Sequence, residues 1–191
     1  MRHFLQWLLL ALPLCIISPA KAQVAFPKSG CEFQVFFLDE PKVSSASVKD
    51  GAGNLVKSDI ADWSVAIKGV THYFRAECAH VPGARKVYSR DEDIIDDMNA
   101  LAAAQSLQSP KVFVKTIDGV GKVGEISGVM VARGISLRID VRRYFGDAAI
   151  FDLYAASDPS AFPTENVSMF MRSISRNGKF YDPEFQKRFG K

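Results

Sequence analysis

Short runs in which apolar and polar residues alternate make up most of this chain. Alternation with a period of two is typical of β-strands that bury one face, and turn-forming residues separate the runs. The pattern predicts strands at 31–38, 42–48, 63–68, 72–79, 111–117, 123–131, 135–144 and 148–155. The segments 24–30 and 81–86, which contain proline and glycine, predict loops.

Two segments show apolar residues at helical spacing instead. The first, at about 89–106, begins with Ser89 and Glu92, which match a capping box. The second, at about 163–173, carries a narrower apolar stripe. Strands followed by a helix, twice over, predict an α+β fold. We expect a mostly antiparallel β-sheet with helices packed on it, an α/β/α sandwich, in a single domain.

The N-terminal segment has the composition of a secretory signal. A positive region at Arg2, an apolar run and the small-residue site Ala20-Lys21-Ala22 follow one another. We expect residues 1–22 to be removed, residues 23–176 to form the domain and residues 177–191 to form a basic, aromatic tail. Export predicts a periplasmic protein if the source is a Gram-negative bacterium, and otherwise a secreted one.

Removal of the signal changes what the net charge implies. The formal charge of +3 falls to +1, because Arg2 and Lys21 leave and no acidic residue leaves with them. A nearly neutral chain gives no electrostatic reason to expect nucleic-acid binding. No second apolar run of membrane-spanning length follows, so no transmembrane segment is predicted.

Two cysteines, Cys31 and Cys78, remain after the signal. An even number of cysteines in an oxidising compartment predicts a disulfide between them. The alternative is a reactive thiol or a metal site at Cys78 and His80, for which His72 is the only further histidine nearby. The chain has no CxxC motif, so we predict the disulfide and no metal.

Candidate catalytic groups are few. His72 and His80 are not accompanied by a GxSxG, HExxH or Ser/Lys motif. Gly119, Gly121 and Gly124 match the letters of a dinucleotide fingerprint, but a strand follows them where the fingerprint needs a helix. We therefore predict a β-turn there, no cofactor and no enzyme. A small hydrolase-like enzyme that uses His72 or His80 is the alternative.

Two surfaces are candidates for binding. In the strand at 135–144 an apolar set would face the core, and Arg138, Asp140 and Arg142 would lie on the other face. That face is either solvated, with cross-strand pairs, or a patch for an acidic partner or an anionic head group. The tail either docks on the domain or stays exposed to grip a partner or a membrane surface. The candidate partner-binding residues are Arg133, Arg138, Arg142, Arg143, Phe185 and Phe189.

Short motifs in the second half resemble a known family. These are 127–134, with a glycine turn after Ser127-Gly128, the arginine-bearing strand and glycine turn at 137–153, and Met169-Phe-Met-Arg-Ser-Ile at 169–174. Phe33-x-Val35-x-Phe37, followed by a proline, is similar too. The order resembles PsbP-like proteins, the α/β/α sandwich group that includes the photosystem II extrinsic P subunit and the Mog family of Ran-binding proteins. The resemblance implies a non-enzymatic assembly or binding role and no catalytic residue.

The sequence therefore predicts a non-catalytic, exported accessory protein that binds a protein partner or a small ligand, with an assembly factor as one form of it. A carrier of lipids or lipid head groups, with its ligand between sheet and helix, is a further alternative to the enzyme. The sequence does not identify the partner, the ligand or the oligomeric state.

Overall fold

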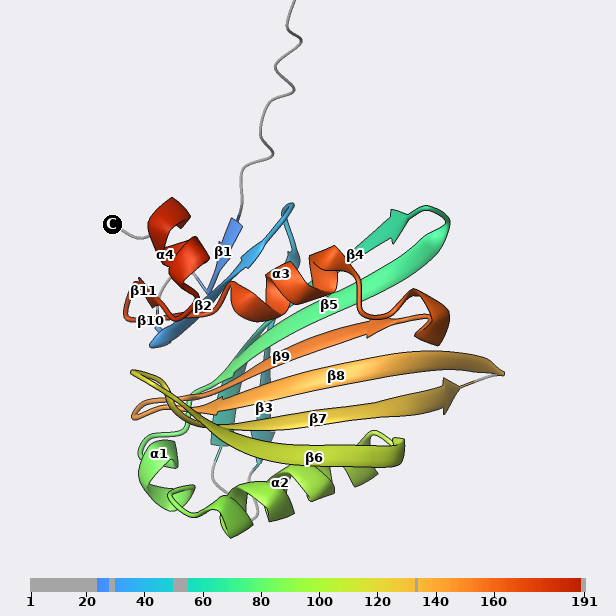
Figure 1. Ribbon diagram of the computed structural model, residues 1–191. Coiled ribbons are helices and arrows are strands. Elements are labelled where there is room, and N and C mark those ends of the chain that lie inside the picture. The colour runs from blue at the N-terminus through green and yellow to red at the C-terminus, as the bar shows by residue number, and fades with distance from the viewer. Residues whose placement is uncertain (1–23, 28–29, 50–54, 133, 190–191) are drawn as a thin grey trace, which may run out of the picture.

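The structure is a computed structural model that describes residues 24–27, 30–49, 55–132 and 134–189. Its centre is a seven-stranded antiparallel sheet in the order β3-β4-β5-β9-β8-β7-β6 (Figure 1). The strands are β3 (Lys42–Lys49), β4 (Leu55–Ile67), β5 (Val70–Ala79), β6 (Gln108–Ile117), β7 (Gly121–Ala132), β8 (Ile135–Phe145) and β9 (Ile150–Ser157). Each strand predicted from residue 42 onward has a counterpart, although β4 begins well before residue 63.

A four-stranded sheet, β1-β2-β10-β11, lies beside the main one (Figure 1). Its strands are β1 (Val24–Phe26), β2 (Phe33–Phe37), β10 (Ser175–Arg176) and β11 (Lys179–Phe180). The prediction of a loop at 24–30 is wrong for Val24–Phe26, which form β1 and pair with β2 in antiparallel register. Because β2 also pairs with β10, segments from the two ends of the chain close into one small sheet.

Different elements cover the two faces of the main sheet. One face, called the α3 face here, packs against β2 and against α3 (Glu165–Arg172). Its core is aromatic: the rings of Phe37 and Phe74 each lie 5.1 Å from that of Phe170, centroid to centroid. The residues that β5 buries on this face are the predicted set, His72, Phe74, Ala76 and Cys78.

The opposite face, called the α2 face, packs against α2 (Asp91–Ala104), which lies over β6 and β7 (Figure 1). Gly124 on β7 permits the close approach of this helix, because a Cβ there would lie 2.6 Å from Met98 Cγ. Gly119 and Gly121 have positive φ in the turn between β6 and β7. The predicted turn is confirmed, and the third glycine of the GxGxxG sequence is a packing position.

The helices depart from prediction in small ways. The N-cap of α2 is Arg90, which makes no side-chain cap bond, so the predicted Ser89–Glu92 capping box is wrong. Arg90 instead donates from Nε to Asp93 at 2.8 Å, within the first helical turn. A short helix, α1 (Ala84–Val87), occupies much of the loop predicted before α2.

The fold is mostly antiparallel sheet with a few helices, as the sequence predicts. Some predictions fall outside the described residues: the signal at 1–22, Arg133 and the side chain of Phe189, whose backbone ends α4 (Pro183–Phe189). Among the described residues, none of the helices combines the length and the apolar character needed to cross a membrane.

Candidate functional site

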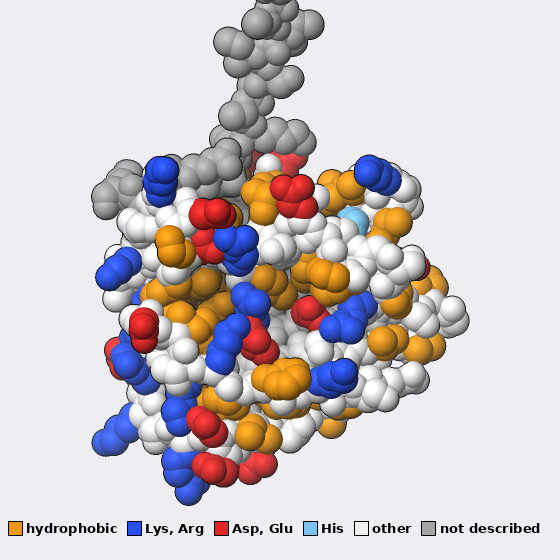
Figure 2. All heavy atoms as spheres, viewed as in Figure 1, with side chains coloured by type: hydrophobic (Ala, Val, Ile, Leu, Met, Phe, Trp, Pro, Cys, Tyr) orange, Lys and Arg blue, Asp and Glu red, His pale blue; other side chains and the backbone are white. Residues whose placement is uncertain are grey.

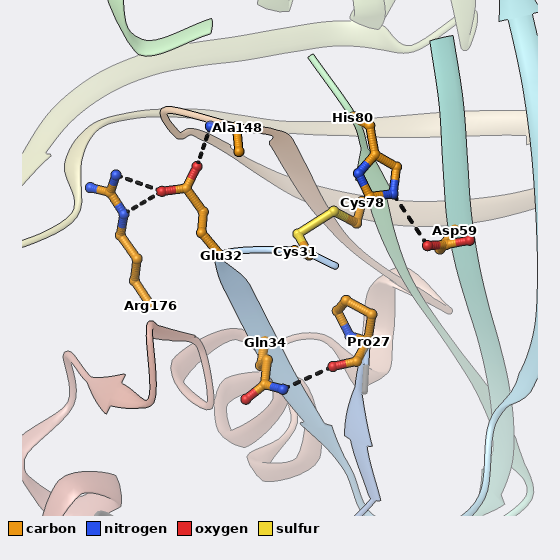
Figure 3. Close-up of a disulfide and its surroundings, with 9 residues drawn as sticks. All are labelled: Pro27, Cys31, Glu32, Gln34, Asp59, Cys78, His80, Ala148 and Arg176. Carbon is orange, nitrogen blue, oxygen red and sulfur yellow. Dashed lines mark hydrogen bonds and ion pairs between the residues drawn. A yellow bond between two sulfur atoms is a disulfide. The ribbon is translucent and has the colours of Figure 1, made fainter. Parts of the chain in front are cut away.

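The predicted disulfide between Cys31 and Cys78 is present. It joins the segment before β2 to β5, and so fastens the small sheet to the main one (Figure 3). Beside it, Glu32 accepts hydrogen bonds from Arg176 Nε at 2.7 Å and from the backbone N–H of Ala148 at 2.8 Å. The covalent bond and this charge cluster hold β2 in place, which indicates a structural role for both.

The two histidines are not arranged for nucleophilic catalysis. His80 Nε2 lies 3.3 Å from Asp59 Oδ2 (Figure 3), and Ser45 Oγ donates to the other oxygen of that carboxylate at 2.8 Å. The Ser45 hydrogen bond and the nearby His80 hold the pKa of Asp59 below its usual value. A catalytic triad places the imidazole between hydroxyl and carboxylate, whereas here the carboxylate lies between them. His72 is buried in the core of the α3 face.

Within the described ranges, histidine, cysteine, aspartate and glutamate side chains do not gather in any group of three or more that would hold a metal ion. Cys78, the centre of the alternative considered from the sequence, is fully buried and bonded to Cys31.

Arg142 lies on the face predicted for it, opposite Glu125 of β7, and α3 partly covers it there. It shares the α3 face with Tyr144, which is fully buried and whose pKa burial raises to about 12. Arg142 Nη1 donates to the backbone oxygen of Met171 at 2.9 Å, and its Nε pairs with Glu125 at 2.7 Å. Lys115 pairs with the same carboxylate at 2.6 Å. Arg142 therefore supports the packing of α3 on the sheet.

Arg138 is the more accessible arginine of this face. It pairs with Asp140 at 3.1 Å. Its guanidinium also lies 5.6 Å from the centroid of the ring of Phe162, the residue that follows the short 3-10 helix η1 (Pro159–Ala161). In Figure 2, blue and red side chains are mixed over the region where Figure 1 draws β7 and β8. A surface on which both signs alternate is poorly suited to select a strongly acidic partner.

Arg143 lies on the opposite face, buried between α2 and the sheet. It donates to Asp152 at 2.7 and 2.6 Å and to Asp97 of α2 at 2.6 Å. Tyr154 also donates to Asp152, at 3.2 Å. Burial disfavours the Arg143 cation, but the two carboxylates outweigh it and hold its pKa above the ordinary value. These contacts leave Arg143 little freedom to meet a partner.

The tail docks on the domain as far as its side chains are described. Phe185 is 8% exposed and stacks on Phe180, which packs in turn against Phe36. Arg172 of α3 pairs with Asp182, just before α4. Of the two arrangements considered for the tail, this is the docked one, with Phe185 facing inward.

A groove that the sequence did not reveal lies on the α2 face. This α2-side groove, of about 950 Å³, is bounded by residues at the C-terminal end of α2 and crosses the main sheet from β3 and β4 to β7. Its floor is apolar, with Leu137 and Ile139 from β8, Met130 from β7 and Ala156 from β9. Pockets for small ligands in proteins have this size and this apolar character.

The rim of the groove is polar at the β3–β5 side. Arg75 binds Asp62 through two hydrogen bonds of 2.7 and 3.1 Å, and these raise the pKa of Arg75. Lys42 and Ser64 line the same side, and Tyr73 stands there 49% exposed. The groove thus combines a broad apolar floor with polar groups at one end.

The sequence predicts one helix for the α2 face, which is too few to cover a sheet of seven strands, and this mismatch could have revealed the groove. A helix about 10 Å across covers two or so strands that lie about 4.8 Å apart, and α2 lies over β6 and β7. Among the described helices, none therefore lies over the same face of β9, β5 and β4. In sequence, the exposed partners of the buried set on β5, Tyr73 and Arg75, mark this uncovered side.

A smaller hollow of about 460 Å³ lies between β1 and the start of β3. Phe26, Pro41 and Val43 contribute its apolar surface, and Glu40 and Asp59 its charge. Both charges are negative and the hollow is half the size of the α2-side groove, so the groove is the stronger candidate.

Comparison with known proteins gives no family: no protein-family model matches the chain, and no curated protein matches its sequence.

Proposed function

We propose that this chain is a non-catalytic, exported binding protein and that the α2-side groove holds its ligand. The observation that carries the proposal is a groove of about 950 Å³ with an apolar floor. It stays open on a sheet that α2, α3 and β2 otherwise cover. Exposed apolar area of this kind is unfavourable in water unless something covers it. We class the fold as an α+β sandwich in which the groove is the uncovered part.

Paired polar groups favour binding over catalysis. Arg75 and Asp62, at the rim, neutralise each other, and neither His72 nor His80 lines the groove. Catalysis needs a group whose proton or lone pair is free to react with the bound molecule. An accessory role of this kind is also what the resemblance to PsbP-like proteins implies.

Export is supported by the signal-like residues 1–22 and by the disulfide. Disulfides persist in the periplasm and outside the cell, and are rare where glutathione and thioredoxin keep thiols reduced. The Cys31–Cys78 bond joins the two sheets, so it has a structural role in this fold.

Site-specific photocrosslinking tests the proposal in the cells that make the protein. A benzophenone amino acid replaces Tyr73, which lines the groove and is 49% exposed, and in a control replaces Phe113, which is 58% exposed on β6, on the other face of the sheet. We expect an adduct at residue 73 and not at residue 113, and its mass distinguishes a small ligand from a polypeptide. No adduct at residue 73, or equal adducts at both, would contradict the proposal.

A further inference from the structure

The α2-side groove has an apolar part that suits a hydrocarbon chain. Leu137 and Ile139 of β8 and Met130 of β7 line it together, with no charged side chain among them. Ala156 of β9, which pairs with Tyr73 of β5, continues this surface toward the middle of the sheet. Burial of hydrocarbon on such a surface is favourable in proportion to the apolar area removed from water.

The positive charge of the groove lies at the other end. Lys42 on β3 is opposite Asp62 on β4, but Asp62 binds Arg75 through both carboxylate oxygens. Lys42 is therefore the cation of the groove that has no ion pair among the described residues. Ser64 and Tyr73, two strands at most from Lys42, add hydroxyl groups beside it. An anionic group would find a charge and hydrogen-bond donors here.

The end near β7 has the opposite electrostatic character. The C-terminal end of α2 reaches the groove with Ala104 and Gln105, and Leu107 just after it packs against Gly128 of β7. The last turn of α2 contains no basic residue. A helix C-terminus carries a partial negative charge, which repels anions. Lys42 and the helix therefore favour the same orientation of a ligand that has a negative end.

From this polarity we propose that the groove binds a single-chain anionic amphiphile. Its acidic head group lies at Lys42, and its hydrocarbon chain runs across the sheet to Met130. The proposal rests on the proposed function, because it names the class of ligand for the same groove. From β3 to β7 the groove crosses five spacings between neighbouring strands, about 24 Å, which is ample for a long acyl chain.

The orientation of the groove argues against an extended peptide as the occupant. The strands that form the floor, β5, β9 and β8, lie inside the sheet, and each is paired on both sides. Their backbone N–H and C=O groups are therefore taken by neighbouring strands. A peptide lying across them would bury its own backbone groups without partners, at a considerable free-energy cost. An acyl chain has no such groups.

The direct test measures displacement of dansyl-undecanoic acid, a fluorescent fatty acid, from the purified, disulfide-bonded protein. Palmitate, hexadecanol and hexadecylamine have the same chain length and carry a negative, a neutral and a positive head group. We expect palmitate to displace the probe at the lowest concentration and hexadecylamine at the highest.

Matched variants locate the two ends of the ligand. Lys42→Glu should weaken palmitate binding about fivefold, as reversal of one exposed charge would do, and leave hexadecanol binding unchanged. Lys111→Glu, at another exposed lysine, on β6, is the control. Leu137→Asp and Met130→Asp should weaken both palmitate and hexadecanol, whereas Val131→Asp and Phe113→Asp, whose side chains point to the other face, should weaken neither. Circular dichroism verifies that each variant is folded.

The outcomes separate this inference from the proposed function. Equal displacement by the three amphiphiles, or unchanged palmitate binding in Lys42→Glu, overturns the assignment of an anionic head but leaves the groove as a binding site. If no amphiphile displaces the probe while residue 73 crosslinks a polypeptide or another small molecule, the ligand class is wrong and the proposed function stands. If residue 73 crosslinks nothing in cells, the proposed function falls as well.

Discussion

Neighbouring arginines on β8 have different tasks, because successive side chains of a strand point to opposite faces. Arg142 reaches the C-terminal end of α3 on one face, whereas Arg143 is buried against α2 on the other. Arg138 lies on the first face with a single carboxylate partner and an aromatic neighbour. The three arginines are close together in the sequence, but in the structure each makes separate packing contacts.

Replacement of Arg143 by methionine should destabilise the protein by about 3–5 kcal/mol, because it leaves buried carboxylates without their cation. The side chains of Arg143, Asp97 and Asp152 are 15%, 22% and 7% exposed. Arg138→Met, which removes a more exposed pair, should cost less than about 1 kcal/mol. Urea unfolding measures both changes. Equal losses in the two variants would mean that the buried network contributes no more than a surface pair.

Glu77 should make stability depend on pH. Burial raises its pKa above the usual 4.5, and the nearby Asp152 adds to the effect. The folded state thus holds the proton more tightly than the unfolded chain. The contribution of this group is fully present below about pH 4.5 and is lost as the pH rises through the raised folded pKa. Glu77→Gln, which keeps the neutral form, should therefore be more stable than the parent at neutral pH.

The comparison for Glu77 is the difference in urea midpoint between variant and parent across the pH range. This difference should shrink toward zero on acidification, when the parent also carries a neutral side chain. Glu40→Gln, at an exposed position, should show no such trend. A difference that is constant with pH would indicate that the amide changes packing and not charge.

At the scale of elements, alternation and turn chemistry predict the strands of the main sheet well. They miss β1, because a three-residue strand is too short for a period to be visible. They also miss most of the first part of β4, where Leu55 and Lys57 are exposed and the apolar signal is weak. The capping box fails because α2 begins one residue later than predicted, so Arg90 and not Ser89 occupies the N-cap position.

Gly124 tests how closely α2 is fitted to β7. A valine there would drive its side chain into Met98 and Ile94, whose atoms already lie 2.6–3.0 Å from an added Cβ. We expect a loss of about 1–3 kcal/mol for Gly124→Val, the usual range for overpacking. Gly134→Val, in the turn after β7, has open space around it but a positive φ, and so measures backbone strain alone. If the two variants lose the same stability, packing against α2 is not the cause at Gly124.

At the scale of the molecule, the sequence predicts the disulfide, the antiparallel sheet and the two longest helices, α2 and α3, but not α1, α4 or the candidate site. The α2-side groove draws on β3, β4, β5, β9, β8 and β7, whose order is not the order of the chain. Met130 and Tyr73 line the same groove because β9 lies between β5 and β8 in the sheet. No local pattern in the sequence carries that information. The placement of β2 over the α3 face is likewise a long-range event, fixed in part by Cys31 and Cys78.

Removal of the disulfide should therefore cost stability without dissolving the fold. The bond closes a loop with a sequence separation of 47 residues, and the loop-entropy relation gives about 4 kcal/mol for that length. In the double variant Cys31→Ala, Cys78→Ala, the small sheet still has the bonds from Arg176 to Glu32 and the aromatic core around Phe33. We expect a lower urea midpoint and an unchanged circular dichroism spectrum. The parent in reductant should behave like the variant, and the variant should not respond to reductant. A parent that keeps its midpoint while mass spectrometry shows two free thiols would contradict this account, and would assign the junction of the two sheets to packing and ion pairs alone.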